Sequence, residues 1–193
     1  MNQGQFFKTA GFLVLLMLLS LALKAQNAYE LTGKPELKVS GGSTLHDWEM
    51  VTASAQGKAE IIVEDQAIKS IKSGEMTMKS ESLKSGKGAM DDIAYKTLKT
   101  KSYEDIQFRM TSFKNISPNR MQVTGNLTIA GVTKSVTFEV QPQVKGATVE
   151  LKGQAAIKFT DYKLTPPTAL LGTIKTDNNL KISFKANFQP INL

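Results

Sequence analysis

The 193-residue sequence contains no cysteine, one histidine, one tryptophan and two arginines. The absence of cysteine excludes disulfides, thiolate metal sites and a lipid-modified N-terminal cysteine, and a single histidine leaves zinc or copper almost no ligands. No acidic run has the spacing of a calcium loop, and no glycine-rich loop precedes a helix to hold phosphate. We therefore expect no metal and no cofactor, and a fold stabilised by core burial and strand pairing.

Charge of one sign is in excess, with a formal net charge of +7 at pH 7. Nearly all of it is lysine, because Arg109 and Arg120 are the two arginines. The lysines alternate with apolar residues instead of forming a stripe, which is typical of a solvated outer face. This distribution argues against nucleic-acid binding and leaves open a loose preference for anionic membrane surfaces.

The N-terminus carries a basic residue, Lys8, followed by the apolar run Ala10–Leu23 and then Ala25. This order predicts a secretory signal peptide over residues 1–25, because a membrane span needs about 20 apolar residues and this run has fourteen. Removal of residues 1–25 takes away two lysines and no acid, so residues 26–193 have a net charge of +5. We expect a periplasmic or secreted single domain, with an uncleaved anchor as the alternative.

Residues of alternating polarity dominate the rest of the sequence. The clearest runs lie at 121–129, 136–140 and 180–188, and weaker ones bring the expected number of strands to eight or nine. Alternation with one polar face predicts antiparallel pairing, because parallel strands buried on both faces have continuous apolar runs. Without a second hydrophobic layer, such a sheet is expected to close on itself, which also removes exposed edges. The pattern thus predicts an all-β, closed antiparallel barrel of about eight strands.

Two stretches interrupt the alternation. Residues from Gly88 to Lys101 place apolar side chains at helical spacing, with acidic residues near the start and lysines toward the end, and predict one amphipathic helix packed on the barrel. The segment Thr160–Asn179 contains Pro166 and Pro167, and we expect an irregular connection there. A connection of that length is usually functional or covers an opening.

Two acidic or nucleophilic groupings deserve a test as catalytic sites. His46 lies beside Asp47 and near Ser43, but neighbouring residues of an extended chain point to opposite faces, so a structural turn is the preferred interpretation. Asp91 and Asp92 diverge by about 100° on a helix and cannot face one bond, so the helix-start interpretation is preferred. We therefore expect a protein that is not an enzyme.

The inward-facing apolar side chains are the remaining candidates for function. Methionine adapts its shape and suits a wall around a flexible chain, and an eight-stranded barrel can be either filled by side chains or hollow enough for one small ligand. Both outcomes stay open from the pattern alone. The predicted apolar wall consists of Trp48, Met76, Met78, Phe108, Met110, Leu127, Ile129, Phe138, Phe159, Ile182 and Phe184.

Three segments resemble a known family. Residues 125–138 (GNLTIAGVTKSVTF) resemble the most recognisable segment of the YceI-like family, whereas residues 42–48 (GSTLHDW) and 166–174 (PPTALLGTI) are similar to segments of a branch common in Bacteroidota. The resemblance covers nearly all of residues 30–190. It implies a lipocalin-like barrel, exported to the periplasm, that holds a polyisoprenoid or similar long amphiphile, and it implies no catalytic residues.

The sequence departs from the family pattern at two places. Asp105 replaces a proline before the strand that follows the helix, and Tyr162 and Lys163 replace a phenylalanine-glycine pair. Both lie where a ligand is expected to enter, and Lys163 is a candidate contact for an anionic head group. An exposed loop lysine is the alternative.

We thus expect an exported protein that carries, stores or sequesters an apolar lipid, with transient membrane contact. The alternative is a non-enzymatic structural or stress-related envelope protein whose barrel is packed solid and whose partner is a protein.

Overall fold

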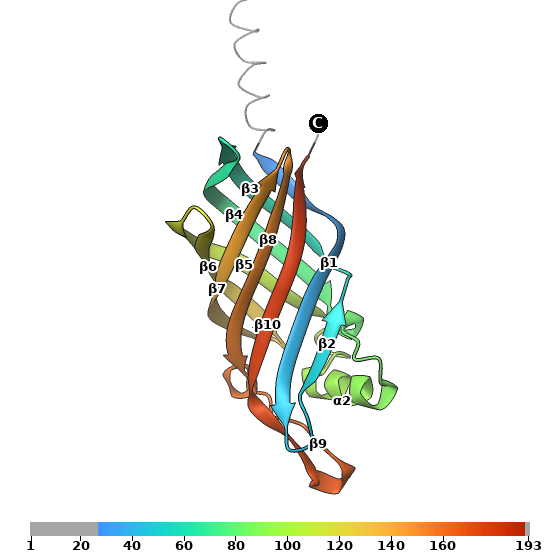
Figure 1. Cartoon of the computed structure of the whole chain (residues 1–193). Helices are drawn as coiled ribbons and strands as arrows, with labels where there is room; N and C mark the ends of the chain where they lie inside the picture. Colours follow the sequence, from blue (N-terminus) through green and yellow to red (C-terminus); the bar gives the residue numbers. More distant parts are fainter. Residues whose placement is uncertain (1–26, 192–193) are drawn as a thin grey trace, which may run out of the picture.

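A computed structural model describes residues 27–191, so the predicted signal peptide at residues 1–25 lies outside the described part. Eight antiparallel strands form a barrel that the pairing of the first with the last strand closes (Figure 1). The strands follow one another around the wall in chain order. They are β1 (Ala28–Ser43), β3 (Gln56–Glu64), β4 (Ala67–Lys79), β5 (Asp105–Ser117), β6 (Arg120–Ile129), β7 (Val132–Lys145), β8 (Thr148–Lys158) and β10 (Ile174–Pro190).

The alternation of the sequence places one set of side chains inside the barrel. On β6, Met121 and Leu127 point inward and are buried, whereas Asn126, next to Leu127, points outward and is exposed. Buried residues from seven of the eight strands form one hydrophobic cluster, and half-buried residues of β5 pack against it. These observations confirm the predicted all-β, closed antiparallel, lipocalin-like barrel of about eight strands with one α-helix.

A bulge interrupts the long strand β1. Its register with β10 shifts between Thr32 and Glu36, and Gly33 adopts a positive φ of 70° there. On the N-terminal side of this bulge β1 pairs with β3, and on the C-terminal side it pairs with the short strand β2 (Trp48–Thr52). The bulge therefore moves β1 from one partner to another partway along the barrel.

The wall opens between β2 and β4 at one end of the barrel, and a helical segment closes the gap. The 3-10 helix η1 (Ser80–Ser82) leads into α2 (Gly88–Leu98), and Figure 1 shows α2 beside β2. Val51 and Lys84 exchange two backbone hydrogen bonds of 2.9 Å each, which tie β2 to this segment. The helix was predicted to Lys101; it ends at Leu98, where Lys99 adopts the left-handed conformation and caps it.

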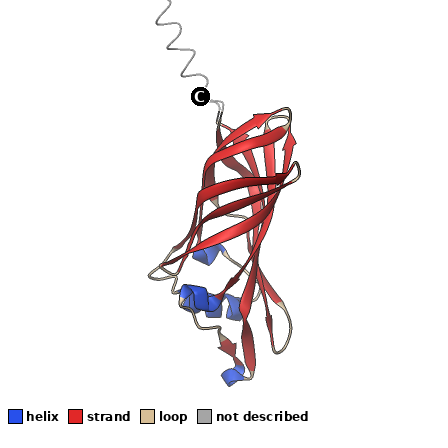
Figure 2. Cartoon of the chain, turned by 90° about the vertical axis from the view of Figure 1, so that its left-hand side faces the viewer, coloured by secondary structure: helices blue, strands red, loops and turns tan. Residues whose placement is uncertain are grey.

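The connection from β8 to β10 lies at the same end. It contains η2 (Phe159–Tyr162), the two-residue strand β9 (Thr168–Ala169) and η3 (Leu170–Gly172), and Figure 2 shows η3 at the lower tip of the molecule. The prediction of an irregular segment through Asn179 was wrong at its end, because β10 begins at Ile174. Thr176 pairs there with Ser43 of β1, and these polar residues carry no hydrophobic alternation.

The barrel therefore has two unlike ends. We call the packed end the one where the buried side chains of Tyr29, Ile68, Met121, Val149 and Ala186 fill the interior. We call the mouth end the one that carries α2, η2, β9, η3 and the turn between β1 and β2. Within residues 27–191 no helix has the length and apolarity needed to cross a membrane.

Candidate functional site: an apolar cavity inside the barrel

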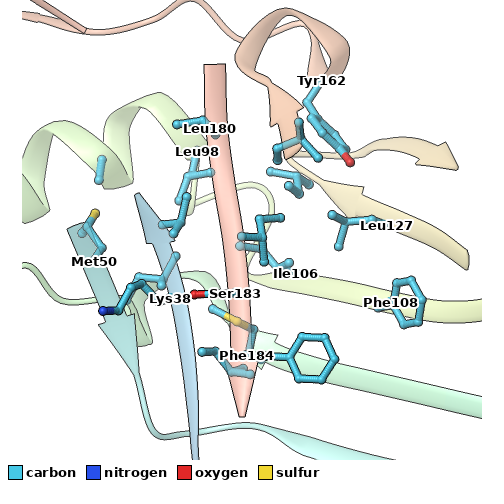
Figure 3. Close-up of a pocket in the computed structure, with 18 of the residues that line it drawn as sticks. Lys38, Met50, Leu98, Ile106, Phe108, Leu127, Tyr162, Leu180, Ser183 and Phe184 are labelled. Atoms are coloured by element: carbon cyan, nitrogen blue, oxygen red, sulfur yellow. The ribbon is translucent and has the colours of Figure 1, made fainter. Parts of the chain in front are cut away.

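A cavity of about 520 Å³ occupies the interior from the mouth end toward the packed end. Its wall is almost entirely apolar, and it receives side chains from all eight barrel strands and from α2. Figure 3 shows Leu98, Ile106 and Leu180 projecting into this space from the helix and from two strands. Leu45 and Thr168 line the cavity and are exposed, so the cavity is open at the mouth end.

The structure places all eleven residues of the predicted apolar wall on the cavity. They reach it from six strands and from η2, and they are Trp48, Met76, Met78, Phe108, Met110, Leu127, Ile129, Phe138, Phe159, Ile182 and Phe184. Period-two alternation is the reason, because it assigns each strand residue to one face of the wall. Contact between these side chains and a ligand remains a prediction.

Three phenylalanines of the wall contact one another. The ring of Phe138 meets those of Phe108 and Phe184 edge to face, with centroid separations of 5.4 and 5.6 Å. Two glycines make room for them, because a methyl group at Gly125 would overlap the Phe108 ring and one at Gly153 would overlap the Phe184 ring. Each of these two rings thus occupies the space that a glycine on the neighbouring strand leaves open.

Sequence reasoning missed the part of the wall that does not belong to the main strands. Helix α2 contributes Met90, Ile93 and Leu98, and the gap beside it is lined by Met50 of β2 and by Leu83. Met50 and Leu83 are 3% and 6% exposed. The amphipathic spacing of residues 88–98 indicated which helix face is apolar, but no local signal showed that this face replaces a piece of barrel wall.

Polar contacts hold α2 in this position. The carboxylate of Asp91 accepts hydrogen bonds from the Ser85 hydroxyl (2.7 Å) and the Ser85 amide (2.8 Å), and these lower the pKa of Asp91. The hydroxyl of Thr100 donates to Glu81 Oε1 at 2.7 Å. Asp91 therefore lies in the first turn of the helix, as predicted, and its carboxylate attaches the helix start to Ser85.

The hydroxyl of Tyr162 is buried and has no hydrogen-bond partner among the described residues. Burial raises the pKa of Tyr162 to about 12, so the phenol is neutral at physiological pH. Its neighbour Lys163 is exposed, ends η2 in the left-handed conformation and does not line the cavity. The proposed contact of Lys163 with an anionic head group stays a prediction.

The turn at the mouth does not assemble a catalytic triad. The Ser43 hydroxyl donates to the backbone carbonyl of His46 at 2.6 Å and accepts from the amides of Leu45 and His46. The His46 ring contacts the backbone carbonyl of Asp47 through Nδ1, at 2.7 Å, and not its carboxylate. The Ser43 side chain thus stabilises the turn, as the structural interpretation of this segment expected.

Trp48 anchors the same turn to the cavity wall. Its indole Nε1 donates to the Gly42 carbonyl at 3.1 Å, and a methyl at Gly41 would lie 2.8 Å from its ring. The half-buried ring thus packs against Gly41, its register partner on β1. No group of three or more histidine, cysteine, aspartate or glutamate side chains within residues 27–191 could hold a metal ion.

A closed eight-stranded antiparallel barrel around an apolar cavity defines the class of lipocalin-like barrels. Within this class, the sequence matches the YceI-like domain over residues 36–188, and the chain belongs to that family. A comparison with curated protein sequences finds no match.

Several solved structures have a similar fold. BcnA from Burkholderia cenocepacia is 19% identical with a TM-score of 0.67, over 79% of this chain and 95% of BcnA. A polyisoprenoid-binding domain from Saccharophagus degradans is 12% identical with a TM-score of 0.59, over 84% of this chain and 98% of that domain. A YceI protein from Campylobacter jejuni is 24% identical with a TM-score of 0.54, over 68% and 80% of the two chains. At these identities the likeness shows the fold alone.

Proposed function

We propose that this protein is an exported lipid-binding protein that holds a polyisoprenoid or similar long amphiphile inside its barrel, for transport, storage or sequestration. The observation that carries this proposal is the cavity of about 520 Å³ with its apolar wall. Pockets that bind small molecules have volumes of roughly 300–1,000 Å³. Membership of the YceI-like family and the fold shared with a polyisoprenoid-binding domain support the choice of ligand.

The chemistry of the wall suits a ligand that is bound by burial. A prenyl chain gains roughly 0.8 kcal/mol for each methylene-sized group that leaves water, so a long chain binds tightly with few polar contacts. The half-buried methionines Met76, Met78 and Met110 adapt to a flexible chain more easily than branched side chains do. The wall therefore selects for length and apolarity over a particular hydrogen-bonding pattern.

Export and membrane contact complete the proposal. The predicted signal peptide at residues 1–25 would deliver the domain of residues 26–193 to the periplasm or the exterior. A prenyl lipid resides in membranes, so the protein is expected to contact a membrane transiently when it takes up or delivers its ligand. Nucleic acid has no place in this function, and no catalytic step is assigned to any residue.

The alternative function, a structural or stress-related envelope protein, assumed a barrel packed solid around its core. The interior cavity removes that assumption. It does not remove a protein partner, which remains compatible with ligand binding. The lipid-binding function is therefore the one that we test first.

Native mass spectrometry of the exported, mature protein tests the proposal directly. We expect a stoichiometric mass excess over the bare chain, which solvent extraction should identify as an isoprenoid. A bare mass, together with no uptake of added geranylgeraniol from detergent, would contradict the proposal.

Charged substitutions on the wall test where the ligand lies. Met110→Asp and Phe184→Lys place a charge in the cavity, and we expect each folded variant to lose the mass excess because an unpaired charge in an apolar site is strongly unfavourable. Gln107→Asp is the matched control, because Gln107 lies on the same strand as Met110 and its side chain is exposed. If a correctly folded wall variant retained ligand, the assigned wall would be wrong.

A further inference from the structure

The three most exposed large apolar side chains of residues 27–191 all belong to the mouth end. Leu45, Leu170 and Leu171 are 64%, 72% and 109% exposed, whereas the next, Ile116, is 47% exposed and lies at the opposite end of the barrel. Single exposed leucines are ordinary, but three beside the opening of an apolar cavity form a local feature. We call Leu45, Leu170 and Leu171 the leucine tip.

Hydrogen bonds hold the two loops of the leucine tip together. The Thr44 amide donates to the Lys175 carbonyl at 3.0 Å, and the Lys175 amide donates to Thr44 Oγ1 at 3.1 Å. The Thr44 hydroxyl also donates to the Thr173 carbonyl, at 3.4 Å. The turn of Leu45 is thereby fixed to the hairpin of Leu170 and Leu171, and Figure 2 shows this hairpin, with η3, projecting past α2.

The backbone of this hairpin is unfavourable for the residues that occupy it. Leu170, Leu171 and Gly172 follow one another with φ values of 47°, 55° and 88°. Asparagine and glycine fit consecutive left-handed positions, whereas the Cβ of leucine crowds the carbonyl oxygen. The fold gains no buried surface in return, because both side chains point into solvent. Because burial within the protein does not offset this strain, the strained and exposed leucines indicate a stabilising contact with another molecule.

The surroundings of the tip favour a lipid bilayer over a protein partner. A stable protein interface buries roughly 800 Å² on each partner and needs a broad face, whereas this hairpin is a narrow projection. Residues 164–174 are uncharged, and Lys163 and Lys175 flank them with exposed side chains. Leucines can enter the acyl region while flanking lysines remain at the phosphates of the head groups.

We infer that the leucine tip is a membrane-docking element that inserts Leu170 and Leu171 into the outer part of a bilayer and sets the mouth of the cavity against it. This inference rests on the proposed lipid-binding function and assigns residues to the membrane contact. Ala169 and Ile174, which flank the inserted residues, line the cavity. An apolar chain therefore passes between bilayer and cavity along a continuous apolar surface and does not cross water.

Vesicle flotation of the mature protein measures the docking. Wild-type protein is expected to float with phosphatidylcholine vesicles that contain a minority of phosphatidylglycerol. Leu170→Ser with Leu171→Ser should lower the partition coefficient roughly tenfold or more, because two leucine side chains no longer leave water. Ile116→Ser is the matched control at the packed end and should float like the wild type.

A second double variant separates docking from folding. Leu170→Asn with Leu171→Gly suits the left-handed backbone, so we expect its melting temperature to rise while its vesicle binding falls to the level of the serine variant. Gain of stability with loss of binding cannot result from misfolding. If this variant bound vesicles like the wild type, the tip would not be the docking element.

Ligand transfer distinguishes failure of this inference from failure of the proposed function. Both double variants should take up geranylgeraniol from detergent as the wild type does, and should extract it from vesicles at least several-fold more slowly. Uptake without any difference in vesicle extraction would overturn the docking element and leave the lipid-binding function intact. Absence of uptake by all proteins would overturn the function itself. Concentration-dependent dimerisation that the serine variant abolishes would assign the tip to a second copy of the chain instead.

Discussion

The two ends of this barrel are built from the same strands, yet one is packed and the other is hollow. On β6, Met121 is fully buried at the packed end and Leu127 lines the cavity; on β8, Val149 and Ile157 show the same contrast. The side-chain types are alike, so composition does not explain the difference. The neighbouring elements explain the difference. Strand β1 changes its partner from β3 to β2 near the bulge, and α2 instead of a strand completes the wall at the mouth end.

This contrast indicates that one end of the domain supplies most of its stability and the other end encloses the cavity. Side chains at the packed end meet across the barrel and supply core burial without disulfides, whereas those at the mouth end face a void and forgo contacts that a ligand can provide. Helix α2 is correspondingly held by polar contacts, such as that of Asp91 with Ser85, in addition to its apolar face. Stability and function thus depend on different ends.

The largest expected effect is on the free energy of unfolding, when a methionine at the packed end is truncated and compared with one on the cavity wall. Met121→Ala should lower the free energy of unfolding by about 2–5 kcal/mol, because its site is closed on every side. Met76→Ala on the cavity wall should cost less than about 1 kcal/mol, because few contacts are lost beside a void. Urea denaturation of the ligand-free protein measures both. Equal losses would mean that the cavity collapses in solution and that the two ends do not differ.

A smaller effect is expected where the aromatic wall meets its glycines. Gly153→Ala places a methyl group in the ring of Phe184 and should cost about 1–3 kcal/mol, as overpacking does. The displaced ring should also enter the cavity and reduce geranylgeraniol uptake, which the stability measurement alone would not reveal. Gly88→Ala is the control, because a methyl there meets nothing within 4 Å. Normal uptake by the Gly153 variant would show that Phe184 moves away from the cavity.

The smallest effect concerns the polar attachment of α2 and depends on pH. The Ser85 hydrogen bonds lower the pKa of Asp91 from its ordinary 3.8, so the folded state favours the carboxylate. The corresponding stability is present above pH 3.8 and is lost as pH falls through the lowered pKa of the folded protein. Ser85→Ala should therefore cost about 1 kcal/mol at pH 7 and progressively less in acid.

Urea denaturation across this pH range, with hydrogen exchange of the α2 amides, measures the contribution. Ser102→Ala is the matched control, because Ser102 is an exposed serine just beyond the helix. A cost that stayed constant from neutral pH into acid would show that the Asp91 carboxylate is not its source.

The elements that sequence reasoning missed share a physical cause. Residues 174–179 of β10 read as irregular because Thr176 and Asn178, on the inner face, are polar where the interior meets water at the mouth. Asn178 instead bonds Thr160 of η2 through both amide atoms, at 3.1 and 3.0 Å. The first half of β1 gives no clear run of alternating polarity, because its bulge breaks the alternation. Hydrophobic periodicity reports a strand only where one face lies against a continuous core.

The sequence by itself determined the closed antiparallel barrel, the one α-helix and the face that each wall residue presents, because strand periodicity has only two outcomes per residue. The tertiary structure alone decided that this face encloses a void, that α2 completes the wall, and that Leu170 and Leu171 project beside the mouth. Those features depend on distances across the barrel, on the bulge that redirects β1 and on hydrogen bonds such as that between Thr44 and Lys175. No local pattern encodes distances between residues that are far apart in the chain.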